Sequence, residues 1–178
     1  MEYAKRKSNR LNGYDYSSYG LYFITICTKD RMEILWTSDV GDGVLDVPLC
    51  CAFDINTVKL SSFGSVIKKH IRSMNNYYSD IKILQYVIMP NHIHFVVQVF
   101  QVSKDGTSRT PSTTNQRIPQ LISTLKRFVN KEIGFNIFQR SYHDHIIRNK
   151  KEFEIISKYI HNNPANWEKD CFYTQKEN

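Results

Sequence analysis

The chain has 178 residues, with 24 Lys or Arg against 17 Asp or Glu, and therefore a formal net charge of +7. This length suits a single domain with its own core, and a hydrophobic fraction of 41% argues against intrinsic disorder. No apolar run approaches the roughly 20 residues that a membrane span needs, and no apolar segment follows the charged N-terminus as in a secretion signal. The four cysteines include no CxxC pair, so neither a disulfide framework nor a thiolate zinc site is indicated, and a reducing cytoplasm is the expected location.

The first part of the chain contains one clear strand and one clear helix. Residues 1–20 form a basic arm rich in tyrosine, and the β-branched and aromatic run at 21–28 predicts a buried strand. Residues 29–59 are ambiguous, with a turn at Asp39–Gly43. A serine at position 61 or 62 is suited to cap a helix that carries Val66, Ile67, His70, Ile71 and Met74.

A hairpin and two further helices are predicted in the rest of the chain. The strands Ile81–Met89 and His92–Val99 meet at a Pro–Asn turn, and the polar stretch 101–117 predicts a mobile loop. Apolar residues recur at helical spacing over Ile118–Ile133. Residues 138–148 predict a strand, and Glu152–Asn163 a helix that Pro164 ends.

The predicted elements follow the order strand, helix, strand, strand, helix, strand, helix. This is the order of the ferredoxin-like split βαβ fold, an α+β class with an antiparallel sheet and helices on one face, plus one C-terminal helix. We expect one domain over residues 21–170, followed by a tail at 171–178. The fold hosts many functions and by itself decides none of them.

Two His-x-His pairs are the first candidates for chemistry. His92 and His94 alternate along a strand, so both imidazoles project from the same face and can reach one divalent ion. Two hydrogen-bonded strand histidines would give the same pattern. The second pair, His143 and His145, could complete a four-histidine zinc site or form a polar strand edge, and His145 could contact a phosphate beside Arg148.

Tyr159 and Asn163 form a third constellation. They lie four residues apart on the last predicted helix and are neighbours on one face. A phenol and an amide at this spacing could serve one site as nucleophile and metal ligand. Because tyrosine has a pKa near 10, it needs a cation or a base nearby to act as a nucleophile. The chain has 11 tyrosines, so a packing role for Tyr159 is the alternative.

These residues lie in segments that resemble a known family. MPNHIHF at 89–95 resembles the His–hydrophobic–His (HUH) motif of single-tyrosine transposases. RKSNRLNGYDYSSYGLYFITICTKDR near the N-terminus, SYHDHIIRN at 141–149 and KYIHNNP at 158–164 resemble the REP-associated tyrosine transposases (RAYTs) in particular. The resemblance is weakest at 33–58 and absent from 101–117.

The resemblance implies a single-strand DNA endonuclease and strand transferase that cuts near short hairpins of palindromic repeats. It implies Tyr159 as the nucleophile and His92, His94 and Asn163 as ligands of Mg²⁺ or Mn²⁺, with Asn163 standing where the wider superfamily has Gln. The expected partner is single-stranded or hairpin DNA, and the expected protein is a monomer or homodimer. Candidate DNA contacts, by charge or placement, are Lys5, Arg6, Lys7, Arg10, Lys126, Arg127, His145 and Arg148.

Three other functions compete with this hypothesis. A hairpin-binding protein of the same fold could lack the chemistry. A histidine-triad hydrolase would need a further alternating histidine, but Val96 occupies that position. A structural zinc protein would use both histidine pairs and would unfold without its metal.

Overall fold

The structure is a computed structural model that describes residues 19–37, 59–100 and 117–173. The predicted arm except its last two residues, the turn at Asp39–Gly43 and the predicted loop up to residue 116 lie outside these ranges. Within the described ranges, no helix combines the length and the apolar character that crossing a membrane requires.

A four-stranded antiparallel sheet forms the centre of the molecule. Its strands are β1 (Gly20–Cys27), β2 (Ile81–Ile88), β3 (His92–Val99) and β4 (His143–Ile147). They lie in the spatial order β2-β3-β1-β4, and every neighbouring pair is antiparallel. This order confirms the predicted ferredoxin-like α+β class.

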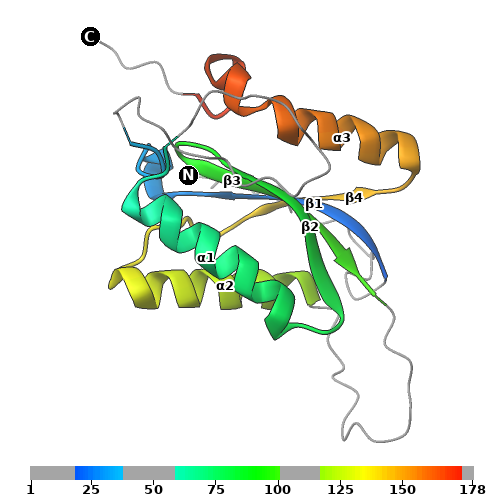
Figure 1. The fold of residues 1–178 in the computed structure, drawn as a ribbon, viewed down its shortest axis with the longest axis horizontal. Helices are drawn as coiled ribbons and strands as arrows, with labels where there is room; N and C mark the ends of the chain where they lie inside the picture. Colours follow the sequence, from blue (N-terminus) through cyan, green and yellow to red (C-terminus); the bar gives the residue numbers. More distant parts are fainter. Residues whose placement is uncertain (1–18, 38–58, 101–116, 174–178) are drawn as a thin grey trace, which may run out of the picture.

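The helices lie on both faces of the sheet. Helices α1 (Ser62–Tyr77) and α2 (Arg117–Ile133) cover one face, and α3 (Lys150–Asn162) lies over the other (Figure 1). Two short 3-10 helices, η1 (Lys29–Arg31) and η2 (Pro164–Lys169), follow β1 and α3. The predicted order of the seven main elements is therefore confirmed, with the added C-terminal helix alone on its side.

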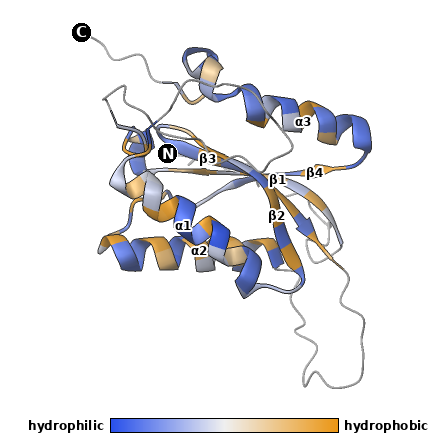
Figure 2. Ribbon diagram, in the orientation of Figure 1, coloured by the Kyte–Doolittle hydropathy of each residue, from blue (hydrophilic) through white to orange (hydrophobic). Residues whose placement is uncertain are grey.

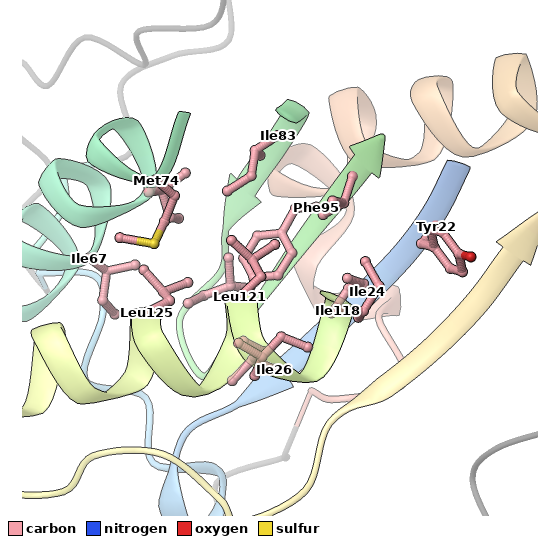
Figure 3. Close-up of a cluster of buried hydrophobic side chains, with 14 of the residues drawn as sticks. Tyr22, Ile24, Ile26, Ile67, Met74, Ile83, Phe95, Ile118, Leu121 and Leu125 are labelled. Atoms are coloured by element: carbon pink, nitrogen blue, oxygen red, sulfur yellow. The ribbon is translucent and has the colours of Figure 1, made fainter. Parts of the chain in front are cut away.

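The main core fills the space between the sheet and the helices α1 and α2. Both helices show a hydrophobic stripe and a hydrophilic remainder (Figure 2), as their helical periodicity predicts. Alternate residues of β3, such as Ile93 and Phe95, are fully buried on this face. Figure 3 shows Phe95 among Ile67 and Met74 of α1 and Leu121 of α2. This face holds the sheet and α1 and α2 together, and it leaves the opposite face of β3 free for other side chains.

A smaller apolar cluster holds α3 on the opposite face. Ile160 packs there with Val87, Met89, Val96 and Ile147, and the partly buried Phe153 and Ile156 join it. Phe153, Ile156 and Ile160 thus form the side of α3 that faces the sheet. The helix begins after Asn149, whose side-chain oxygen accepts a hydrogen bond of 2.9 Å from the backbone N–H of Glu152.

Strand β4 is shorter than the strand predicted at 138–148. Phe138 forms only an isolated bridge to Thr28, and the regular ladder begins at His143. The ammonium of Lys126 lies between the two and donates to the carbonyl oxygens of Gln139 at 2.6 Å and Ser141 at 3.2 Å. These carbonyls accept from a side chain of α2 in the stretch where the regular ladder is interrupted.

A short segment before α1 supports the turn between β2 and β3. The backbone N–H of Leu35 donates to the carbonyl of Pro90 at 3.0 Å, and the indole N–H of Trp36 donates to the carbonyl of Ile88 at 2.7 Å. Gly64, in the first turn of α1, packs directly against the carbonyl oxygen of Leu35. This close approach is possible because glycine has no Cβ.

We expect Gly64→Ala to destabilise the fold. The added methyl group would overlap the carbonyl oxygen of Leu35, so the segment that supports the turn would have to shift. Overpacking of this kind lowers the free energy of unfolding by about 1–3 kcal/mol. Urea unfolding followed by circular dichroism measures the change. The neighbouring exposed Ser65→Ala serves as control and should change stability by less than about 0.5 kcal/mol; an equal effect of both substitutions would contradict the packing argument.

Candidate active site

The two histidines of the HUH motif lie at the start of β3. Ile93 and Phe95 point into the main core, so His92 and His94 project from the other face, toward α3. Their Nε2 atoms are 2.9 Å apart. The two residues are 0% and 2% exposed, so the pair is withdrawn from water.

Hydrogen bonds to the Nδ1 atoms orient both rings. The side-chain amide of Asn91 donates from Nδ2 to the carbonyl of Phe172 at 2.8 Å, so its oxygen faces the Nδ1 atom of His92, also at 2.8 Å. An amide oxygen only accepts, so Nδ1 of His92 carries the proton and Nε2 offers a lone pair. The Nδ1 atom of His94 lies 2.8 Å from the hydroxyl of Thr25, which can donate or accept.

Burial keeps both imidazoles uncharged. It lowers the pKa of His92 to about 4, although the nearby carboxylate of Asp170 acts in the opposite direction; the positive charge of Arg31 lowers it further. Burial also lowers the pKa of His94 well below its usual value, and the neighbouring His92 adds to the effect. Both side chains are therefore neutral at pH 7, which is the form that a metal ligand requires.

Helix α3 brings Tyr159 to the same place. Its hydroxyl oxygen lies 3.3 Å from Nε2 of His94 and donates to Oδ2 of Asp170 at 3.0 Å. The ring packs edge-on against Phe23 of β1, and the residue as a whole is 40% exposed. Partial burial and the charge of Asp170 raise the pKa of the phenol above its usual value, so Tyr159 is protonated at neutral pH.

Asn163 follows Tyr159 by one helical turn and is 3% exposed. Neither atom of its side-chain amide forms a hydrogen bond of normal geometry with the described residues. The amide nevertheless lies close enough to the hydroxyl of Tyr159 to oppose the rise in the pKa of the phenol. A buried amide without partners is costly, and a bound ligand would supply the missing interaction.

Asp170 completes the cluster, and the sequence analysis missed it. It follows η2, which folds back over the site after Pro164. Its Oδ1 accepts a hydrogen bond from the backbone N–H of Phe172 at 2.8 Å. The other oxygen, Oδ2, faces the hydroxyl of Tyr159 and lies 4.0 Å from Nε2 of His92. Only the reversal of the chain brings this carboxylate to the histidines, so no spacing in the sequence signals it.

The cluster fits a divalent cation. Ligand atoms of His92, His94 and Asp170 lie within 4.8 Å of one another. The side chain of Asp170 is 1% exposed, and it forms no ion pair with a lysine or arginine among the described residues. A buried carboxylate without a cationic partner is unfavourable. Two neutral imidazoles and this carboxylate form a mixed nitrogen and oxygen donor set of the kind that holds divalent metal ions.

The second histidine pair does not join this cluster. His143 and His145 lie opposite Thr25 and Phe23 of β1, on the sheet face that carries His94. His145 instead pairs with Glu152 of α3, with 2.6 Å between Nε2 and Oε1. In the ranges that the structure covers, the cluster of potential metal ligands includes neither histidine, so the four-histidine zinc site is not formed there.

The predicted DNA contacts lie in several places. The arm residues Lys5, Arg6, Lys7 and Arg10 fall outside the described ranges. Lys126 and Arg127 belong to α2, on the sheet face opposite the histidines (Figure 1). Burial lowers the pKa of Lys126 to about 8, and its ammonium holds the backbone at 139–141, whereas Arg127 is exposed. Arg148 is exposed at the end of β4, next to the start of α3.

Comparison with known proteins identifies the family. The family model described as "Transposase IS200 like" matches residues 56–163, which is more than half of the chain. The chain belongs to the IS200-like transposase family. The resemblance to single-tyrosine transposases predicted from the sequence is therefore confirmed.

Two further matches are one protein sequence and one solved structure. A Haemophilus influenzae protein described as uncharacterized is 31% identical over 184 residues, covering 94% of this chain and 93% of the relative. The structure of a REP-associated tyrosine transposase bound to a REP hairpin matches with a TM-score of 0.55 and 17% identity, covering 94% of this chain and 74% of that one. At this identity the second match establishes a common fold, which is the fold predicted from the resemblance to RAYTs.

We expect the stability of the metal-free protein to fall as the pH is lowered from about 6.5 to 4. An unfolded histidine titrates near 6.5, whereas folding lowers the pKa of His92 to about 4. Between these pH values the unfolded chain binds more protons than the folded protein. The free energy of unfolding therefore decreases as the pH is lowered, by roughly 3 kcal/mol for His92. Above about pH 6.5 the imidazole of His92 is neutral in both states, so this loss of stability is absent.

Urea unfolding in EDTA at a series of pH values measures this dependence. The variant His92→Gln lacks the titrating imidazole and should show a shallower decline over the same window. Parallel curves for the two proteins would contradict the assignment of the low pKa to buried His92.

Proposed function

We propose that this chain is a metal-dependent single-strand DNA endonuclease and strand transferase. It would act on hairpin-forming palindromic repeats through a 5′-phosphotyrosine intermediate. The observation that carries the proposal is the position of the Tyr159 hydroxyl, 3.3 Å from Nε2 of His94 and 3.0 Å from Oδ2 of Asp170. Membership of the IS200-like transposase family supports it.

The cation would be held by His92, His94 and Asn163, as the resemblance implies, with Asp170 as a further ligand. A bound Mg²⁺ or Mn²⁺ would orient the scissile phosphate and stabilise the negative charge that develops in the transition state. The protein residues supply the neutral imidazoles, the carboxylate charge and the fixed position of the phenol.

In the reaction, the phenolic oxygen of Tyr159 attacks phosphorus in line with the bond to the 3′ oxygen. The phenolic proton passes to solvent water, which reaches the 40% exposed Tyr159, because Oδ2 of Asp170 would already serve as a ligand. The bond from phosphorus to the 3′ oxygen breaks, and this oxygen takes a proton from water to leave as a hydroxyl. Because the phosphotyrosine is itself a phosphodiester, a second 3′-hydroxyl can reverse the step and join another strand without ATP.

The proposed substrate is single-stranded or hairpin DNA, encountered in the cytoplasm. The structural relative bound to a REP hairpin supports this choice. Basic side chains would contact phosphates and aromatic side chains would stack on unpaired bases. On the described surface, His145 and Arg148 remain the candidates nearest to α3, and the predicted contacts of Lys126 and Arg127 would require DNA to reach the opposite face of the sheet.

The variant Tyr159→Phe tests the nucleophile. The wild-type protein, with Mn²⁺ and a hairpin oligonucleotide labelled at its 3′ end, should form a covalent adduct on a denaturing gel, because the 3′ portion stays on the tyrosine. Removal of the phenol should reduce adduct formation by at least roughly 10³-fold. Tyr77→Phe, on the exposed side of α1, is the matched control and should retain the adduct.

The other outcomes of this experiment are equally informative. An adduct formed by Tyr159→Phe would disprove this nucleophile and make Tyr142 the next candidate. Hairpin binding by the wild-type protein with no adduct at any metal concentration would favour the hairpin-binding protein without chemistry.

The variant Asp170→Asn tests the carboxylate. In EDTA it should be at least as stable as the wild type, because the substitution removes a buried charge that pairs with no lysine or arginine in the described part of the chain. Its affinity for Mn²⁺ should fall roughly 10-fold or more, since a charged donor is lost. Calorimetric titration and urea unfolding measure the two effects. The exposed neighbour Glu168→Gln is the control, and unchanged Mn²⁺ affinity in Asp170→Asn would exclude Asp170 as a ligand.

A further inference from the structure

Asn91 is a buried polar residue that the proposed chemistry does not use. It ends the turn between β2 and β3 and is 1% exposed. Both atoms of its side-chain amide are bonded, to two different parts of the site. The oxygen faces Nδ1 of His92 at 2.8 Å, and the nitrogen donates to the carbonyl of Phe172 at 2.8 Å.

The turn itself does not depend on this side chain. The backbone carbonyl of Asn91 accepts from the N–H of Thr28 at 2.9 Å and from its hydroxyl at 3.0 Å. The N–H of Met89 donates to the carbonyl of His92 at 2.8 Å across the turn. Main-chain hydrogen bonds already close the turn. The formation of the turn therefore does not explain why both atoms of the Asn91 side-chain amide form hydrogen bonds.

The segment bound by the amide nitrogen carries two parts of the site. The N–H of Phe172 donates to Oδ1 of Asp170 at 2.8 Å, which directs Oδ2 toward Tyr159. The ring of Phe172 packs against His92, with 4.6 Å between the ring centroids. Holding the carbonyl of Phe172 therefore holds both the Asp170 carboxylate and the cover over His92.

We propose that Asn91 is a positioning residue with two separable tasks, one at each end of its amide. The oxygen fixes the His92 tautomer that presents the Nε2 lone pair to the cluster. The nitrogen anchors the segment 170–172 and so places the Asp170 carboxylate. The consequence for metal binding rests on the proposed function, whereas the tautomer and the anchoring are properties of the metal-free protein.

Two substitutions separate the tasks. Asn91→Asp keeps an oxygen acceptor for His92 but replaces the donor to Phe172 with a second acceptor, which repels the carbonyl. Asn91→Leu has a similar volume and removes both interactions. The main-chain bonds to Thr28 remain available in each variant, and the thermal unfolding midpoint shows whether each one folds.

Three measurements report separately on the His92 tautomer, the anchoring of the segment 170–172 and metal binding. In metal-free protein, ¹⁵N NMR of the imidazoles should report the Nδ1–H tautomer of His92 in the wild type and in Asn91→Asp, and its loss in Asn91→Leu. Hydrogen exchange of the Phe172 amide should be at least 10-fold faster in both variants. Titration with MnCl₂ should give roughly 10- to 100-fold weaker binding for Asn91→Leu and a smaller loss for Asn91→Asp.

The proposal fails if Asn91→Leu keeps the wild-type tautomer, or if Asn91→Asp leaves exchange at Phe172 unchanged. If Asn91→Leu does not fold, Asn91→Asp alone still tests the anchoring. A wild-type protein that binds no Mn²⁺ would overturn the proposed function while the tautomer and exchange measurements continue to test Asn91.

Discussion

The site depends on the exclusion of water from two imidazoles whose Nε2 atoms lie 2.9 Å apart. In water, histidine is partly charged near neutral pH, and two cations at this separation would repel each other. Burial lowers the pKa of both His92 and His94, so the pair can exist as two neutral rings. The sheet fixes the direction of the two rings, because Ile93 and Phe95 of β3 fill the main core on its other face. Their burial comes from the rings that cover them, Phe172 over His92 at 4.6 Å and Phe23 over His94 at 5.0 Å between ring centroids.

The charges on the α3 side of the sheet are arranged around this neutral pair. Asp170 places a buried carboxylate beside it, and the same carboxylate raises the pKa of the Tyr159 phenol. Taken alone, the arrangement is unfavourable for both groups, because the carboxylate forms no ion pair with a lysine or arginine of the described residues and the phenol is harder to ionise. A divalent cation in the cluster would remove both costs at once. Within the described residues, the cluster of two neutral imidazoles and one carboxylate could therefore hold a ligand of positive charge.

The sequence predicted the position of a side chain correctly where that position depends on the local periodicity of a strand or helix. The alternation around His92 predicted its face, the helical spacing predicted that Asn163 would follow Tyr159 by one turn, and the serine before α1 predicted the cap at Ser61. It failed where contacts depend on the path of the chain between elements. Asp170 reaches the histidines only because η2 reverses the chain, and Lys126 of α2 binds carbonyls of the segment 139–141, where a strand was predicted. Neither contact could be predicted from a regular spacing of residues in the sequence.

The two histidines also differ in how firmly their protons are placed. The Asn91 oxygen allows only one tautomer of His92, so its Nε2 is an acceptor, and the bond between the two Nε2 atoms then requires the proton of His94 on its own Nε2. For both Nε2 atoms to offer lone pairs, His94 must carry its proton on Nδ1. The partner of that nitrogen is the hydroxyl of Thr25, which donates to one tautomer and accepts from the other. An amide beside His92 therefore holds that ring in a single tautomer, whereas the hydroxyl beside His94 keeps its hydrogen bond in either tautomer of that ring. When the proton of His94 moves to Nδ1, the bond between the two Nε2 atoms is lost and both lone pairs become available to a cation.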